Sequence, residues 1–221
     1  MAEPERVDLR LEACYPYLET EDQGAEQACV AHSFAMGLYC LKAQASLLTL
    51  PQSGLHRPSV ASLFEPALRA SPDPRRGVSF EAVMRGLEAQ HGRDLEALGW
   101  RLESLGNDVA RARTCLQQGG PVVVGYQVNA QIARFHEDVA ECRRHGYVLP
   151  AFARDPTAAS AHAVLLIGYD DRLRAFLARN SWGPRWGVDG HFLVPYAQVG
   201  DATATTHVVG FVRQRQASQR T

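Results

Sequence analysis

The sequence predicts an α+β protein, with a mainly helical first half followed by a β-rich second half. Apolar residues recur at helical spacing in the first half, and short apolar runs bounded by turn residues replace them after residue 120. The chain has 221 residues, of which 46% are hydrophobic and 21% charged. This composition is enough to bury a core, either as one globular unit or as two packed lobes.

Three segments of the first half predict helices. Residues 29–48, "CVAHSFAMGLYCLKAQASLL", carry apolar residues at helical spacing. Residues 79–90 start with a serine cap, and residues 107–120 start with a capping asparagine and stop at two glycines. The segments 51–59 and 71–77 are rich in Pro, Gly and Ser, so we expect loops there.

The second half begins with a predicted buried strand at 121–128, "PVVVGYQV". A helix is expected within 129–146 and a loop within 149–160. Three more strands are predicted at 162–169, 174–180 and 207–213. The final residues, 214–221, read as a polar tail.

The charge and cysteine content exclude several classes of function. A formal net charge of -1 gives no support for nucleic-acid or membrane-surface binding. The chain shows no secretory signal pattern and no apolar window of about 18 residues, so we expect neither export nor a membrane span. An odd number of scattered cysteines predicts a reduced, cytoplasmic protein. These cysteines are Cys14, Cys29, Cys40, Cys115 and Cys142.

Three residues could form a nucleophilic site. Cys29 follows a polar, glycine-containing turn and opens a predicted helix, His162 enters an apolar strand, and Asn180 ends another strand. Taken singly, each has an ordinary structural explanation, since a free cysteine packs as a small hydrophobe and a lone histidine is usually a satisfied structural residue. Their joint order and spacing are what point to chemistry, because His162 lies 133 residues and Asn180 151 residues after Cys29.

The motifs around these residues are specific. "DQGAEQAC" (22–29) resembles an Asp-or-Asn-Gln-Gly turn that precedes a catalytic cysteine, and "AHAVLLIGYD" (161–170) resembles a His-Ala-Val segment. "RNSWGPRWGVDGHF" (179–192) nearly reproduces an Asn-Ser-Trp-Gly-x-x-Trp-Gly-x-x-Gly motif. On these motifs, and over residues 4–196, the sequence resembles the papain-like (C1-type) cysteine peptidases.

This resemblance implies a papain-like two-lobe fold, with residues 1–221 as a single catalytic domain. A mainly helical lobe, 11–118, would carry the nucleophile. An antiparallel, β-barrel-like lobe, 119–213, would carry the histidine and the asparagine, with the active-site cleft between the two lobes.

The resemblance also implies a role for each site residue. A thiol with a pKa of about 8.5 is a few per cent ionised at neutral pH. A helix N-terminus and a neighbouring imidazolium lower that pKa. Cys29 would be the thiolate nucleophile, and His162 would return the proton to the leaving amine. Asn180 would orient the imidazole, Gln23 and the Cys29 backbone N–H would form the oxyanion hole, and Trp182 would shield the Asn180–His162 hydrogen bond.

Further residues are carried over from the same motifs. Gly183 and Trp186 are expected to support the site, although an indole is often an ordinary core anchor. Gly77 is the nearest match to a two-glycine segment that binds substrate backbone, and that segment is incomplete here. Ala163 matches a position that lines the pocket for the second residue before the cleaved bond.

The sequence also departs from the family pattern. Glu26 stands where a disulfide-forming cysteine is usual, Val30 replaces an aromatic residue, and Ala161 stands where many members have Asp or Asn. The lost cysteine fits a cytoplasmic protein. "PERVDLR" (4–10) resembles the start of a mature enzyme without an inhibitory pro-segment. We therefore expect a selective processing enzyme of a bacterial cytosol that acts on a peptide or protein substrate, with a regulatory or substrate partner in place of a pro-segment and with no cofactor or metal.

Three alternatives remain beside this hypothesis. A transglutaminase or other acyltransferase would use the same acyl-enzyme and differ only in the acceptor, and a non-catalytic peptide-binding module could share the fold. A zinc site could use Cys29 with His32 and Cys142 with His145, which have ligand-like spacing. The zinc site is the weakest of the three, because it would leave the Asn-Ser-Trp-Gly motif unexplained.

Overall fold

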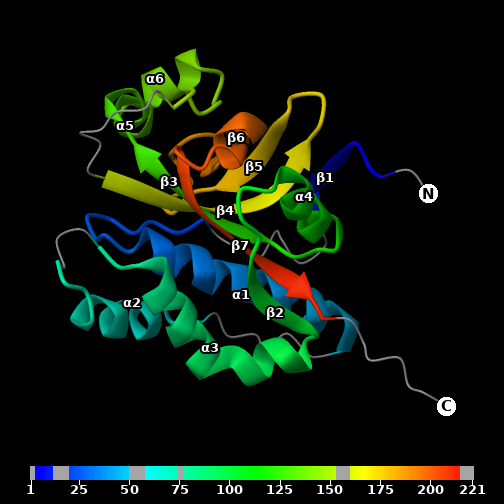
Figure 1. Ribbon diagram of the computed structural model, residues 1–221. Helices are drawn as coiled ribbons and strands as arrows, with labels where there is room; N and C mark the ends of the chain where they lie inside the picture. Colours follow the sequence, from blue (N-terminus) through cyan, green and yellow to red (C-terminus); the bar gives the residue numbers. More distant parts are fainter. Residues whose placement is uncertain (1–2, 12–19, 50–57, 74–76, 153–159, 215–221) are drawn as a thin grey trace.

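The computed structural model describes residues 3–11, 20–49, 58–73, 77–152 and 160–214. Cys14, most of the predicted loops at 51–59 and 149–160, and residues 215–221 of the predicted tail lie outside this set. Within the described residues, three long helices gather on one side of the molecule, and an antiparallel sheet with shorter helices forms the other side (Figure 1). The predicted α+β architecture is therefore confirmed.

The helical side consists of α1 (Cys29–Thr49), α2 (Val60–Arg69) and α3 (Phe80–Ala97). The first predicted helix is confirmed, and the helix predicted over 79–90 extends further because Leu87 and Leu95 both face the core. The helix α2 was not predicted; its signal is two buried residues four positions apart, Leu63 and Ala67. None of the described helices is both long and apolar enough to cross a membrane.

Among the described residues, the sheet has seven strands, and these pair antiparallel. Its order is β2-β7-β3-β4-β5-β6, and β1 pairs with β4. The strands are β1 (Arg6–Asp8), β2 (Trp100–Ser104), β3 (Val122–Val128), β4 (Ser160–Asp170), β5 (Ala175–Arg179), β6 (His191–Pro195) and β7 (Thr205–Arg213).

The four predicted strands are confirmed as β3, β4, β5 and β7, while β1, β2 and β6 were not predicted. Two of these additional strands come from the first half of the chain, so the sheet is not built from the second half alone. The sequence signal for β2 is its alternation, because apolar Trp100 and Leu102 are separated by polar Arg101 and followed by Glu103.

The shorter helices correct two local predictions. The helix α4 (Val109–Gln117) is capped by Asp108, whose side chain accepts from the Arg111 N–H, whereas the predicted cap Asn107 donates to backbone carbonyls of Val199 and Thr205. The helix predicted within 129–146 is two helices, α5 (Ala130–Glu137) and α6 (Val139–Arg144). The chain breaks at Asp138, which adopts an extended conformation and caps α6.

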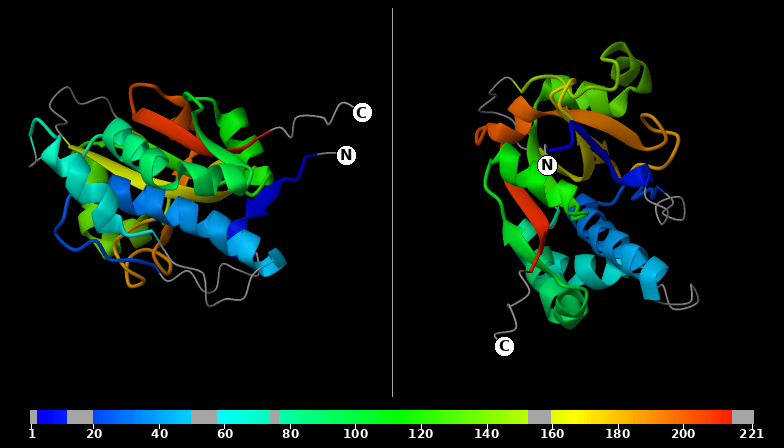
Figure 2. Two further views of the ribbon diagram at one scale, coloured as in Figure 1. Left: turned by 90° about the horizontal axis from the view of Figure 1, so that it is seen from below. Right: turned by 90° about the vertical axis from the view of Figure 1, so that its right-hand side faces the viewer.

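The helix α1 lies between the sheet and the other two long helices, as the right-hand view in Figure 2 also shows. Its Phe34 ring packs edge-on against Phe80 of α3 and Phe211 of β7, with ring centroids 5.8 and 6.4 Å apart. The helix contacts β3 and β4 along the same side. The first residue of α1, Cys29, is thereby held against the sheet.

Candidate active site

Cys29 starts α1 and lies against β4. The residue is only 9% exposed, and burial raises the pKa of the thiol. A hydrogen bond from the backbone of Ala163 acts in the opposite direction and lowers that pKa. Because Ala163 directly follows His162 in β4, the structure brings together the two residues that the sequence predicts as nucleophile and base, although they are far apart in the chain.

His162 is held in a single tautomer by Asn180, which directly follows β5. The His162 Nε2 atom lies 2.8 Å from Asn180 Oδ1, and the same oxygen accepts from the Ser181 backbone N–H at 2.9 Å. The Ser181 N–H can only donate, so it fixes which amide atom is the oxygen, and His162 Nε2 must then carry the hydrogen. This leaves Nδ1 of His162 as the nitrogen that can accept a proton.

The face of the His162 ring is covered by Trp182. The two rings are stacked, with centroids 4.5 Å apart and planes 25° from parallel. Trp186 packs edge-on against Trp182 at 5.2 Å and donates from Nε1 to the backbone carbonyl of His136. Both tryptophans of the Asn-Ser-Trp-Gly motif thus form one aromatic cluster over the imidazole.

Gly183 allows the motif to approach the segment before the nucleophile. Its φ is +76°, and its N–H donates to the Glu21 carbonyl at 2.6 Å. A Cβ atom on Gly183 would lie 3.3 Å from a carboxylate oxygen of Asp22, so a side chain there would meet both strain and crowding. The close approach places residues 21–23 beside residues 181–183.

Gln23 is fixed at both ends of its side-chain amide. Its Oε1 accepts from the Ser181 hydroxyl at 2.5 Å, and its Nε2 donates to the Glu26 carbonyl at 2.6 Å. One Nε2 hydrogen is left over, since an amide carries two. Ser181, which links Gln23 to Asn180, was not predicted as a site residue. Its position inside the Asn-Ser-Trp-Gly motif could have indicated its role.

The two predicted substrate-binding residues both lie beside the nucleophile segment. Gly77 has a φ of +83°, and a Cβ atom there would lie 3.0 Å from the carbonyl oxygen of Gln27, two residues before Cys29. Ala163 is fully buried and lies opposite Gly125 of β3. Their part in substrate binding stays a prediction.

A second histidine, His32, lies one turn after Cys29 in α1. Its Nδ1 pairs with the Glu21 carboxylate, which ties α1 to the segment that carries Gln23. A cavity of about 10 Å³ adjoins this pair and Asn180. His145, the other histidine of the zinc hypothesis, pairs with Glu141 instead, and the described residues contain no group of three or more His, Cys, Asp or Glu side chains that could hold a metal.

The charge states of the site follow from its burial. His162 is 6% exposed, and burial lowers its pKa to about 4, while its hydrogen bond to Asn180 acts to raise it. Burial therefore disfavours a charged Cys29 beside a neutral His162, and equally a charged His162 beside a neutral Cys29. A thiolate and an imidazolium formed together would stabilise each other, and the N-terminus of α1 would add to the stabilisation of the thiolate.

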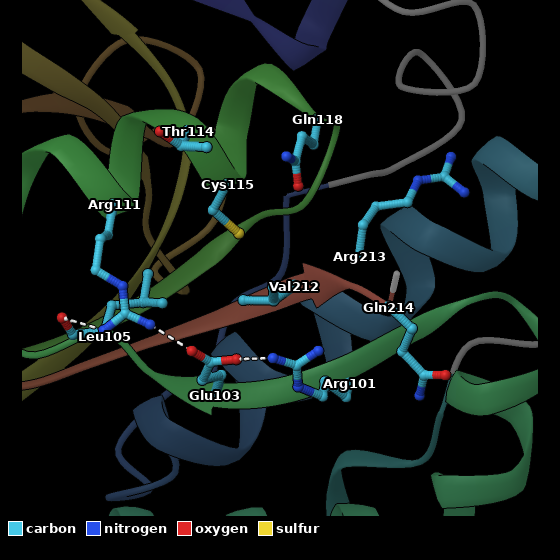
Figure 3. A pocket seen from close by; sticks show the side chains of 10 residues that line it. All are labelled: Arg101, Glu103, Leu105, Arg111, Thr114, Cys115, Gln118, Val212, Arg213 and Gln214. Carbon is cyan, nitrogen blue, oxygen red and sulfur yellow. Dashed lines mark hydrogen bonds and ion pairs between the residues drawn. The ribbon is translucent and has the colours of Figure 1, made fainter. Parts of the chain in front are cut away.

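Another pocket, of about 700 Å³, lies between α4 and the strands β2 and β7 (Figure 3). Two of its arginines, Arg101 and Arg111, pair with Glu103. Its cysteine, Cys115, donates from Sγ to the carbonyl of Phe211, and burial raises the pKa of this thiol to about 12. The described lining includes no histidine, so this pocket lacks the chemistry found at Cys29.

Comparisons with known families agree with this geometry. Residues 100–210 match the model of the papain family of cysteine proteases. An uncharacterised peptidase C1-like protein of Acanthamoeba polyphaga mimivirus is 42% identical over 40 residues, which are 18% of this chain and 13% of that protein. A cathepsin B-like protein of Giardia intestinalis, CP2, is 30% identical over 90 residues, 39% of this chain and 26% of that protein. The chain thus matches about a quarter or less of these relatives.

Solved structures share the fold across nearly the whole chain. Xylellain, a cysteine protease from Xylella fastidiosa, superposes with a TM-score of 0.72 at 20% identity, covering 97% of this chain and 88% of xylellain. A cysteine protease of Carica candamarcensis, in complex with E-64, superposes with a TM-score of 0.60 at 16% identity, covering 96% and 100%. The predicted papain-like two-lobe fold is thereby confirmed. The family match and these similar proteins do not favour the acyltransferase or the non-catalytic alternative.

Proposed function

Because the chain belongs to the papain family of cysteine proteases, we propose that it hydrolyses peptide bonds with Cys29 as nucleophile and His162 as acid and base. The observation that carries this proposal is the tautomer of His162. Asn180 accepts a hydrogen bond from Nε2, so Nδ1 is the ring nitrogen without a hydrogen, and the residue after His162, Ala163, contacts the Cys29 thiol. That nitrogen is the base a neutral thiol requires.

The reaction follows from this arrangement in two halves. The Cys29 proton passes to His162 Nδ1, and the sulfur attacks the carbonyl carbon of the scissile bond. The resulting oxyanion would accept hydrogen bonds from the remaining Nε2 hydrogen of Gln23 and from the Cys29 backbone N–H. When the carbon–nitrogen bond breaks, His162 gives its proton to the leaving amine, and an acyl-enzyme thioester remains.

In the second half, water replaces the amine. His162 removes a proton from the water as it attacks the thioester, and the second tetrahedral intermediate breaks its carbon–sulfur bond. The carboxylic acid leaves, and the proton held by His162 returns to the sulfur of Cys29. The hydrogen bond to Asn180 and the stacked Trp182 keep the imidazole in one orientation through both halves.

We further propose selective processing of a peptide or protein substrate rather than general digestion. Cys29 and His162 are 9% and 6% exposed, which supports this reading, because little of either residue is accessible to an approaching chain. Rapid, sequence-tolerant digestion of denatured casein by the purified protein would contradict it. A partner protein that controls access or delivers the substrate is part of the same proposal.

A bacterial cytosol is the proposed location. Glu26 supports it, since this exposed carboxylate occupies the position where secreted family members place a disulfide cysteine. The fold similarity to xylellain, from the bacterium Xylella fastidiosa, supports a bacterial source. Cell fractionation with an antibody against the protein would test the location, and recovery from the periplasm or the medium would contradict it.

Intact-mass spectrometry after treatment with an epoxysuccinyl inhibitor tests the proposed nucleophile. We expect one inhibitor per chain in the wild type and none in Cys29→Ala. Cys40→Ala is the matched control, because Cys40 is a second buried cysteine of the same helix, and this variant should label like the wild type. A folded wild type that takes no label, or labelling that persists in Cys29→Ala, would overturn the proposal.

A further inference from the structure

A second buried histidine lies next to His162 and has no part in the mechanism above. His136, in the last turn of α5, is 7% exposed. Its ring centroid lies 5.2 Å from that of His162 and 4.8 Å from that of Trp182, and both contacts are edge-on. His136 therefore contacts both rings of the stacked pair that the mechanism relies on.

The position of His136 is fixed by a buried hydrogen bond. Its Nε2 lies 3.0 Å from the hydroxyl of Tyr126, a fully buried residue of β3. Tyr126 pairs directly with His162 across β3 and β4, and its ring packs edge-on against the His162 ring at 5.8 Å. Residues that pair directly in an antiparallel sheet point to the same face, so the backbone register itself places Tyr126 beside His162.

The backbone of α5 is equally well anchored. Asn129 caps the helix directly after β3, with Oδ1 accepting from the N–H groups of Gln131 and Ile132 at 3.1 and 2.9 Å. At the other end, the His136 carbonyl accepts from Trp186 Nε1 at 2.9 Å. His136 is thus held through its side chain by β3 and through its carbonyl by the Asn-Ser-Trp-Gly motif.

We propose that His136, held by the Tyr126 hydroxyl, is a positioning residue for His162: it fixes the imidazole and Trp182 in the orientation that proton exchange with Cys29 requires. Asn180 anchors His162 at Nε2, Trp182 covers one face, and Tyr126 and His136 supply two further ring contacts. The proposal rests on the peptidase function proposed above.

The charges around His136 are compatible with this role. Burial, with a further contribution from His162, holds the pKa of His136 well below its usual range, so His136 stays neutral when His162 takes the thiol proton. Burial also raises the pKa of Tyr126, which keeps its hydrogen. A neutral ring at 5.2 Å does not repel the imidazolium, whereas a charged one would.

Three variants separate this role from a merely structural one. Tyr126→Phe removes only the hydroxyl and keeps the ring against His162, so it is the variant least disturbing to the fold. His136→Gln removes the ring and keeps a polar side chain. His145→Gln is the matched control, because it makes the same change in a partly buried histidine that packs on Phe135 and pairs with Glu141.

The measurement is the inactivation of each purified protein by an epoxysuccinyl inhibitor, resolved into its binding constant KI and its chemical rate constant kinact. We expect kinact to fall about 10-fold in His136→Gln and about 3-fold in Tyr126→Phe, as for modest losses of catalytic positioning. KI should stay within about twofold in both. Thermal unfolding establishes that the variants are folded, and His145→Gln should retain the wild-type kinact.

The double variant Tyr126→Phe/His136→Gln adds a second criterion. If the two residues act as one unit, its kinact should equal that of His136→Gln alone. Unchanged kinact in both single variants, an equal loss in His145→Gln, or losses that multiply in the double variant would overturn the proposal. A wild-type protein that the inhibitor does not modify at Cys29 would instead overturn the proposed function, and this proposal with it.

Discussion

Asn180 Oδ1 lies 2.8 Å from His162 Nε2, and it also accepts a hydrogen bond from the Ser181 backbone N–H. With two donors at one oxygen, the amide has a single orientation and the imidazole a single tautomer. This relationship between β4 and the residue after β5 leaves Nδ1 as the basic nitrogen of a buried histidine.

Asn180→Ala should lower the rate of inactivation by an epoxysuccinyl inhibitor about 100-fold. This lies between the tenfold expected for about 1.4 kcal/mol and the roughly 10⁴-fold typical of a wrong imidazole tautomer. Asn180→Asp is the control. Asn180 Nδ2 has no hydrogen-bond partner among the described residues, so the aspartate keeps an oxygen that accepts from His162 and loses no hydrogen bond seen in the structure. An alanine variant as reactive as the wild type would contradict the assigned role.

Gln23→Ala should reduce turnover of a fluorogenic peptide library by about 100-fold or more, because one oxyanion donor is lost. Ser181→Ala should cause a smaller loss, about tenfold, because it only releases the Gln23 amide from its 2.5 Å hydrogen bond. Steady-state kinetics on both variants test the order of these effects. If Ser181→Ala were the more damaged of the two, the serine would act by some route other than Gln23.

Acid should destabilise the protein through its buried histidines, and His191 of β6 allows a test outside the site. Burial, with nearby Arg179 and Arg10, lowers its pKa to about 4, below the pKa of about 6.5 that a histidine has in the unfolded chain. The folded state therefore binds fewer protons, and the stability present above pH 6.5 is lost as the pH falls toward 4.

We expect this histidine to contribute a loss of about 2 kcal/mol between pH 7 and pH 5. Urea unfolding gives the change in unfolding free energy between the two pH values for the wild type and for His191→Gln. The difference between these two changes is the contribution of His191. The variant should lose correspondingly less stability on acidification, whatever its stability at pH 7. Identical pH dependence in both proteins would rule out His191 as the titrating group.

Gly77→Ala should lower the free energy of unfolding by about 1–2 kcal/mol, since its φ of +83° and the 3.0 Å contact with the Gln27 carbonyl both oppose a side chain. Gly86→Ala is the paired comparison, because a Cβ atom there meets nothing within 4 Å and alanine favours the interior of α3. It should raise the unfolding free energy by about 0.5–1 kcal/mol. Urea titrations of both variants measure the two changes in unfolding free energy. Changes of the same sign in the two variants would contradict the prediction.

Local patterns predicted much of the fold. The long helix from Cys29 and the four strongly apolar strands follow from the periodicity of their own residues. The strands β1, β2 and β6 escaped prediction, because each has only three to five residues and gains its stability from a neighbouring strand. Asn107 shows the same limit, since either of two adjacent residues could cap α4, and contacts with Val199 and Thr205 engage the asparagine.

The sequence by itself determined the family resemblance, and it predicted Cys29, His162, Asn180 and Gln23 as site residues, because these residue types at these spacings fit one chemical purpose. Only the tertiary structure decided which groups surround them. Ser181 behind Gln23, and His136 with Tyr126 beside His162, are brought there by strand register and helix placement. Such contacts depend on how distant segments pack together, and no periodicity within one segment encodes them.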